Sequence, residues 1–180
     1  MLLSLFLVYS DVLYSDTNNS VDKNEMNLAE KDFSSTITDG KSLILNSEIF
    51  GIDGKGQPFS MKAQKTGYDR EKISMKNIYL KIFLFDKKET IIYADQGIYS
   101  INKKQIDLQK NVKITMSDGD LIEAYSINIE YDKGIITSNH PVSAVSKNDK
   151  ISANGFKIIY SAKEKNITFY GDAKVDFSIN

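Results

Sequence analysis

The sequence IYADQGIYSINKKQIDLQKNVKI, which runs from Ile92 to Ile114, contains the pattern that decides the fold. Apolar residues occupy every second position within it, which is the period of a β-strand and not that of a helix. They are Ile92 and Ala94, then Tyr99 and Ile101, then Ile106, Leu108, Val112 and Ile114. The stretch is therefore predicted to form strands with one apolar face.

Copies of this pattern stand before and after it in the chain. The surroundings of Ala94 recur around Ala63, Ala124 and Ala153, at separations of 31, 30 and 29 residues. A period of this length indicates one supersecondary unit per repeat. The second half of the unit has apolar residues at relative positions 0, 2, 6 and 8, both in 106–114 and in 167–175. We expect each unit to contain a long bent strand, a turn and two short strands.

The alternation changes phase by one residue inside each copy. Apolar residues fall at even positions up to Ala94 and at odd positions from Gly97 to Ile101, and the same change follows Ala124 and Ala153. An out-of-phase residue in a strand is typical of a bulge or a bend, which keeps the apolar side facing one way while the chain turns. The fold class is therefore predicted to be all-β, with bent antiparallel strands.

Composition excludes several classes of function. The 180 residues are 41% apolar and carry a formal net charge of -1, with no cysteine and one histidine. The chain is long enough for a sizeable core. It lacks the basic face that nucleic-acid binding requires, so no nucleic acid is expected as a partner. Without cysteine, disulfides, thiolate metal sites and cysteine nucleophiles are excluded.

Three regions are expected along the chain. Residues 1–14 are strongly apolar but would span only about 21 Å as a helix, at about 1.5 Å per residue. We interpret them as the later part of a helical membrane anchor that begins upstream, with a cleaved signal or a buried helix as alternatives. Residues 15–41 are polar and are predicted to be a flexible linker with one short helix near 26–31. Residues 42–180 are predicted to form the β domain, beginning with a strand over 42–50.

No catalytic, metal or cofactor site is predicted. The glycine-rich GIDGKG at 51–56 leads into a strand pattern, whereas a phosphate loop leads into a helix, so it is interpreted as a hairpin turn. The acidic SDGD at 117–120 lacks the spacing of a calcium loop and is also interpreted as a turn. His140 lies in the turn before Pro141 and lacks partners for a triad or a metal site. The protein is therefore expected not to be an enzyme.

Three segments resemble the LptC family, the membrane-anchored periplasmic component of the lipopolysaccharide export bridge. They are GIDGKGQPFSMKA, YADQGIYSINKKQIDLQKNVKI and ISANGFKIIYSAKEKNITFYGDAKV. The resemblance covers roughly 42–177 and also includes the apolar amino terminus and the polar tether. Soluble bridge proteins of the LptA type share the repeat, and only the amino-terminal anchor favours LptC.

The resemblance implies a bent, open β-jellyroll whose interior carries the acyl chains of lipopolysaccharide. It implies lipid transfer from the subunits of the inner-membrane ABC transporter to an LptA-type periplasmic bridge protein. It also implies a single-pass protein of the inner membrane with its β domain in the periplasm. Inward-facing apolar residues of the repeats are then candidates for the lipid groove, although the same residues would form a plain core in a protein that binds no lipid. The candidates are Phe59, Met61, Ala94, Tyr99, Ile101, Leu108, Val112, Ile122, Ile127, Ile129, Tyr131, Phe156, Ile158, Ile167 and Phe169.

The two ends of the sheet are candidate interaction sites. An unpaired strand edge promotes aggregation unless it is blocked or used, and neither terminal strand region contains a proline. Both edges are expected to add strands of partner subunits. The candidate edge residues are Leu43, Leu45, Ile49, Ala173, Val175 and Phe177. A soluble LptA-type bridge protein, a closed β-sandwich acting as an adhesin or carbohydrate-binding module, and a hydrolase on a β-helix are the alternatives.

Overall fold

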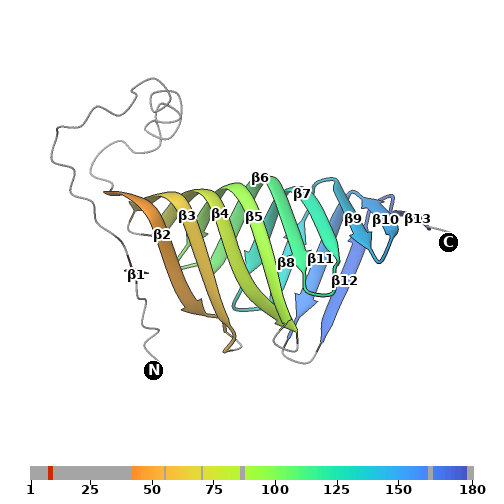
Figure 1. Cartoon of the computed structure of the whole chain (residues 1–180), viewed down its shortest axis with the longest axis horizontal. Helices are drawn as coiled ribbons and strands as arrows, with labels where there is room; N and C mark the ends of the chain where they lie inside the picture. Colours follow the sequence, from red (N-terminus) through yellow and green to blue (C-terminus); the bar gives the residue numbers. More distant parts are fainter. Residues whose placement is uncertain are drawn as a thin grey trace, which may run out of the picture.

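The computed structural model describes residues 8–9, 42–54, 56–69, 71–85, 88–161 and 164–177, which form one sheet of thirteen strands. The strands are β1 (Val8–Tyr9), β2 (Ser42–Ile52), β3 (Pro58–Asp69), β4 (Lys72–Phe85), β5 (Lys88–Ser100), β6 (Gln105–Met116), β7 (Leu121–Glu130), β8 (Ile135–Ser138), β9 (Val142–Ser146), β10 (Asp149–Ala153), β11 (Gly155–Tyr160), β12 (Lys165–Tyr170) and β13 (Lys174–Asp176). Figure 1 shows them side by side along the longest axis of the molecule. The predicted all-β fold with antiparallel strands is confirmed.

The sheet divides into two layers that share their longest strands. From β2 to β7 each strand pairs antiparallel with the next one in the chain. Beyond β7 the sheet splits, because one half of β7 pairs with β8 and the other half pairs with β9. We call the layer that continues through β8, β11 and β12 layer A, and the layer that continues through β9, β10 and β13 layer B. Strands β2 to β7 therefore contribute one half to each layer.

The long strands change layer along a single row of residues, which we call the crease. In β2 and β4 the crease residue is an asparagine in the left-handed backbone region, with a φ of 50° at Asn46 and at Asn77. In β6, Lys110 and Asn111 both have positive φ values, and the two together lie opposite Tyr125 of β7. Two residues opposite one make a bulge, which bends a strand and increases its twist. This row coincides with the phase change predicted from the sequence.

Side-chain hydrogen bonds link neighbouring strands at the crease. The Asn77 side-chain amide donates to Gln64 Oε1 of β3. In the same way, Asn111 Nδ2 donates to Asp95 Oδ2 of β5 at 2.7 Å. These bonds join polar groups across adjacent strands at the row where the backbone departs from regular geometry.

The prediction of two short strands in the second half of each unit is wrong for 106–114. Strand β6 runs through this region without a break, and its bulge lies between Leu108 and Val112. The prediction holds in the later copies, where 136–144 is divided between β8 and β9, and 167–175 between β12 and β13. Pro141 explains the first division, because it has no N–H to donate to a ladder.

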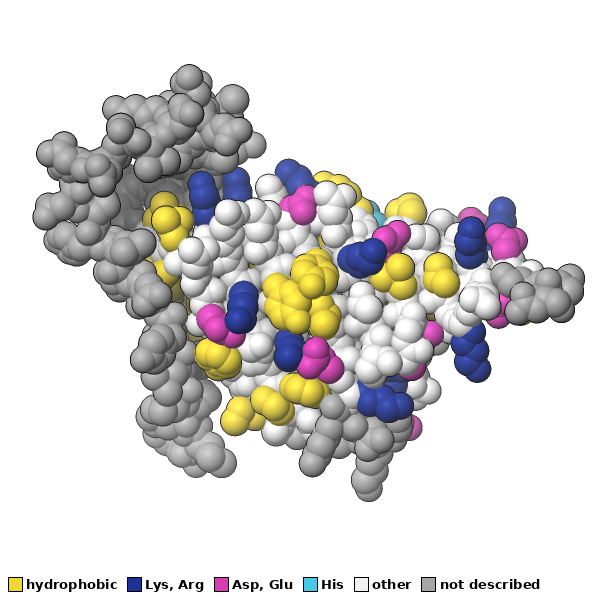
Figure 2. All heavy atoms as spheres, in the orientation of Figure 1, with side chains coloured by type: hydrophobic (Ala, Val, Ile, Leu, Met, Phe, Trp, Pro, Cys, Tyr) yellow, Lys and Arg dark blue, Asp and Glu magenta, His cyan; other side chains and the backbone are white. Residues whose placement is uncertain are grey.

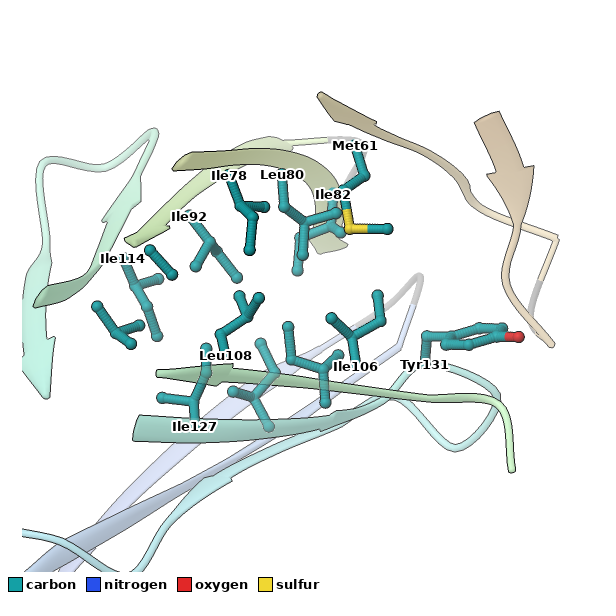
Figure 3. Packing of buried hydrophobic residues seen from close by; sticks show 14 of the residues in the cluster. Met61, Ile78, Leu80, Ile82, Ile92, Ile106, Leu108, Ile114, Ile127 and Tyr131 are labelled. Carbon is teal, nitrogen blue, oxygen red and sulfur yellow. The ribbon is translucent and has the colours of Figure 1, made fainter. Parts of the chain in front are cut away.

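Apolar side chains of the two layers meet in one core. In layer B a row of cross-strand partners runs from Ile49 through Met61, Leu80, Ile92, Ile114, Ile122, Ala144 and Ile151 to Val175. In layer A a row runs from Tyr68 through Ile73, Tyr99, Ile106, Ile129, Ile136 and Ile158 to Ile167. Figure 3 shows side chains of the two layers pointing toward one another. Each row crosses the sheet along the molecular axis, from one edge region to the other.

The expected turns are present at three places. The chain turns from β2 to β3 after Ile52, within GIDGKG, and SDGD joins β6 to β7 with Gly119 at a φ of 91°. Pro141 immediately precedes β9, as predicted. Of the amino-terminal region expected to contain an anchor and a linker, only Val8 and Tyr9 are described, and they pair as β1 with Glu48 and Ile49 of β2. The short helix expected near 26–31 lies outside the described residues. No helix in the described part of the chain is long and apolar enough to cross a membrane.

Candidate functional site

The predicted groove residues come together in the space between the two layers. Twelve of the fifteen are buried, and Leu108, Ile129, Phe156 and Ile158 have exposed fractions of 0 to 1%. Ile101, Ile167 and Phe169 are partly buried and pack against this core. The repeats thus place the candidate residues on one shared apolar lining.

This lining is packed and not open at its centre. Leu80 and Ile92 of layer B and Leu108 and Ile129 of layer A are 0% exposed, so solvent does not reach them. The sheet is open, as a β-jellyroll of the predicted kind requires, but the side chains at the centre of its lining pack together and leave no accessible groove there. The physical reason is that parallel rows of Ile and Leu bury apolar area most favourably when the layers close on each other.

The lining becomes exposed at the carboxy-terminal end of the sheet. The inward-facing residues of β12, such as Ile167 and Phe169, are only half-buried, and Val175 of β13 is 44% exposed. Phe177, which follows β13, is 74% exposed, and Ala173 is exposed as well. The apolar surface that is sealed at the centre of the molecule is therefore open to solvent at this end.

The amino-terminal edge differs in the direction of its side chains. Leu43 and Leu45 of β2 are 47% and 48% exposed, but Ile49 is only 4% exposed and belongs to the core. All three were predicted as edge residues. The backbone of β2 still forms the boundary of the large strands, and the described part of the chain covers it only with the two residues of β1.

A cluster of aromatic residues joins the layers at the margin opposite the crease. The rings of Phe59 in layer B and Tyr131 at the end of β7 lie 5.4 Å apart between centroids. The Tyr131 hydroxyl is 3.1 Å from the Tyr99 hydroxyl within a hydrogen bond. Burial, together with this hydrogen bond, raises the pKa of Tyr99 well above its usual value. Tyr160 at the end of β11 is also buried, and desolvation and the nearby Asp53 raise its pKa.

A second contact joins the same margin farther along the molecule. Lys165, the first residue of β12 in layer A, reaches the β6–β7 turn of layer B. Its Nζ lies 2.7 Å from Asp118 Oδ2, 3.2 Å from Met116 Sδ and 3.8 Å from Asp120 Oδ2. Burial acts to raise the pKa of Asp118, but the hydrogen bonds from Lys165 and from the Asp120 backbone hold it below its usual value.

Sequence reasoning identified some lining residues and missed others. Ile78, Leu80 and Ile114 are as buried as the candidates, and the same alternation that selected the candidates also marks them. The contacts of Lys165 with Asp118 and of Phe59 with Tyr131 were not predicted. They join residues 47 and 72 positions apart, and alternation reports which way a side chain faces but not which distant turn it meets.

The outer surface carries mixed charge. Ion pairs join Lys62 to Glu48 and Lys113 to Glu123 across neighbouring strands of layer B. Figure 2 shows side chains of both signs scattered over one face, with hydrophobic side chains in small groups between them. Within the described residues, no three His, Cys, Asp or Glu side chains gather to hold a metal ion. The polar chemistry of this surface thus offers no site comparable to the apolar interior.

Comparison with known proteins identifies one family. A family model described as "Lipopolysaccharide-assembly, LptC-related" matches residues 1–177 of the chain. No match was found among curated individual proteins. The matched region includes the whole described sheet and also the apolar amino terminus.

Proposed function

The chain belongs to the LptC-related family of lipopolysaccharide-assembly proteins, and from this we propose that it carries the acyl chains of lipopolysaccharide between its two layers. The family takes part in lipopolysaccharide transport as an inner-membrane-anchored periplasmic component. In this proposal the lipid comes from the subunits of the inner-membrane ABC transporter and passes to an LptA-type bridge protein. In this proposal a single-pass anchor holds the protein at the inner membrane. The protein performs no catalysis.

The observation that carries this proposal is the pair of apolar rows, which run from β2 to β13 in layer B and from β3 to β12 in layer A. Every residue of the layer B row, from Ile49 to Val175, is apolar. A plain core would contain such a row too, but it would not need the row to continue to an exposed end, where Val175 is 44% exposed. Each buried methylene group contributes about 0.8 kcal/mol, so an acyl chain along such a row is strongly favoured over water.

The repetition of similar side chains suits movement along the row. Neighbouring strands lie about 4.8 Å apart, so an acyl chain meets a similar Ile, Leu, Met or Val side chain at each step. Because the binding free energy of the acyl chain is nearly the same at neighbouring positions, the barriers between these positions are small. The lipid is then held firmly against escape into water, but only weakly at any one position along the axis.

Photocrosslinking from inside the core tests the binding site. A photoreactive amino acid at Ile129, Ile158 or Phe169 is expected to capture lipopolysaccharide, because all three side chains face the space between the layers. The matched control is Thr115, which lies on a core strand but is exposed on its outer side. Circular dichroism establishes that each variant is folded. Folded protein that captures lipid no better from Ile129 than from Thr115 would contradict the proposal.

Strand addition is proposed at both ends of the sheet. At the carboxy-terminal end, β12 and β13 are the last strands of their layers, and Val175 and Phe177 are exposed beside them. A partner strand would satisfy the unpaired backbone groups and would continue the apolar lining into the next molecule.

Site-specific crosslinking tests this pairing. With the LptA-type protein co-expressed, a photoreactive residue at Val175 or Phe177 is expected to yield a crosslinked heterodimer. The same residue at Thr115, near the middle of the sheet, should yield none. A protein that stays monomeric and uncrosslinked at Val175 under co-expression would exclude pairing at this edge.

A further inference from the structure

The packed interior sets a requirement that the proposed function must meet. Leu80, Ile92, Leu108 and Ile129 have no exposed area, so an acyl chain cannot lie among them while the layers stay in contact. Packed protein interiors contain few voids larger than a water molecule. If lipid occupies this lining, the two layers must move apart.

The covalent structure restricts where they can part. At the crease, strands β2 to β7 pass without interruption from one layer to the other, and hydrogen bonds such as that from Asn111 to Asp95 link neighbouring strands there. Opening at the crease would break these strands. The opposite margin consists of strand ends and turns, so the layers can separate there with the ladders intact.

Several contacts join the layers among the described residues of this margin, and two of them have a defined side-chain geometry. The first, which we call the aromatic clasp, joins Phe59 to Tyr131. Beside it, the β2–β3 hairpin touches the β7–β8 turn so closely that a Cβ built on Gly54 would lie 2.7 Å from the Asp132 carbonyl oxygen. The aromatic clasp thus closes the half of the margin nearest β2.

The second contact, which we call the lysine clasp, joins Lys165 to Asp118 and Asp120. The Lys165 side chain is only 18% exposed and also contacts Met116 of the core. Its ion pair is therefore more shielded than the pairs on the outer face, such as Lys113 with Glu123, whose side chains are about half exposed. The lysine clasp closes the margin toward β12.

We propose that the margin opposite the crease is the opening through which acyl chains enter, and that the aromatic and lysine clasps hold it shut between loadings. This inference rests on the proposed function. An acyl chain that enters beside Phe59 and Tyr131 exchanges one apolar contact for another, so the aromatic clasp can open at small cost. The crease acts as the hinge.

A reversible disulfide between the two layers, placed beside the aromatic clasp, tests this opening. The chain has no cysteine, so Gly54→Cys with Asp132→Cys introduces the only thiols. A Cβ on Gly54 would lie 2.8 Å from Asp132 Cγ, and disulfide-linked Cβ atoms are about 3.8 Å apart, so the pair is within reach of a bond. A photoreactive residue at Ile129 reports lipopolysaccharide capture. The reduced form controls for strain that the two substitutions introduce.

The oxidised protein is expected to lose capture of lipopolysaccharide, and reduction is expected to restore it. The matched control, Lys113→Cys with Glu123→Cys, joins two cross-strand neighbours within layer B and should capture lipid in both redox states. Undiminished capture by the oxidised clasp variant would overturn the proposed opening but leave the lipid-binding function intact. Absence of capture in the oxidised, reduced and parent proteins alike would reject the function, and the opening with it.

The lysine clasp gives an independent measurement. Lys165→Gln removes the ion pairs with Asp118 and Asp120 but keeps a side chain of similar length. We expect the initial rate of capture at Ile129 to rise while the amount captured at saturation stays the same. An unchanged or lower initial rate in folded Lys165→Gln protein would overturn the role assigned to this clasp.

Discussion

At the scale of single residues, the margin of the core is notable for buried hydroxyl groups among aromatic rings. Tyr99 is 1% exposed, and its hydroxyl pairs with that of Tyr131. A buried hydroxyl needs a partner, and each of these two supplies the other. The arrangement favours the neutral form of Tyr99, because a phenolate would be desolvated and would lose the proton that it donates or shares.

This pair predicts how stability depends on alkaline pH. The pKa of Tyr99 is raised in the folded protein, so the unfolded chain releases its proton first as pH rises past the usual value of 10.0. The stabilisation is complete below that pH and decreases above it. Urea unfolding at a series of pH values from neutral to above 10.0 should show a decline that is shallower in Tyr99→Phe. An equally steep decline in Tyr99→Phe would assign the effect to other groups.

At the scale of strands, the crease is the feature that the sequence predicted best. The phase change after Ala94 indicated a bend, and β5 has a register shift at this place in its ladder with β6. Ala94 and Gly97 are small for a physical reason. A Cβ on Gly97 would lie 2.6 Å from Ile78 Cδ1 and 2.7 Å from Leu108 Cδ2. The layers converge here, and little side-chain volume fits.

The parts that were not predictable depend on geometry in three dimensions. Alternation does not say whether the longer step between relative positions 2 and 6 of the unit becomes a bulge, as in β6, or a break, as between β8 and β9. Pro141 was a visible signal for the break, whereas the two positive φ values at Lys110 and Asn111 had no clear one. The clasps depend on how far each layer twists before its turns meet the other layer. That twist accumulates over many strands and leaves no local mark in the sequence.

Left-handed asparagines predict a specific substitution pattern at the crease. Asn77 has a φ of 50°, which glycine adopts freely and which a β-branched residue adopts only with strain. Asn77→Val should therefore lower the free energy of unfolding by about 1–3 kcal/mol, whereas Asn77→Gly should change it much less. Chemical denaturation of both variants measures the difference. Equal losses would mean that the hydrogen bond to Gln64, and not the backbone, fixes the crease.

At the scale of the whole molecule, the protein has an apolar interior and a nearly neutral exterior. Its formal net charge is -1, and exposed ion pairs such as Lys62–Glu48 contribute little to stability. A surface of this kind cannot attract an anionic lipid over a distance. The affinity proposed for lipopolysaccharide must then come from burial of its acyl chains, which salt does not screen.

Salt dependence tests this view of the whole molecule. Capture at Ile129 should change by less than about two-fold between about 0.1 M and 1 M sodium chloride, although the screening length falls from about 10 Å to 3 Å. The concentration of divalent cations is held constant, because it alters the state of lipopolysaccharide itself. A large fall in capture with rising salt would place the main affinity in headgroup contacts.

The repeat, which forms two long strands in the copy made by β5 and β6, has a further consequence for how such a molecule changes in size. One unit of about thirty residues adds two strands, or about 10 Å of length at about 4.8 Å per strand, while the crease and both rows keep their places in cross-section. Tandem duplication of one unit would lengthen the protein without changing the size of its cross-section. The length of the protein is thus set by the number of copies, and its cross-section is set by the residues within each copy.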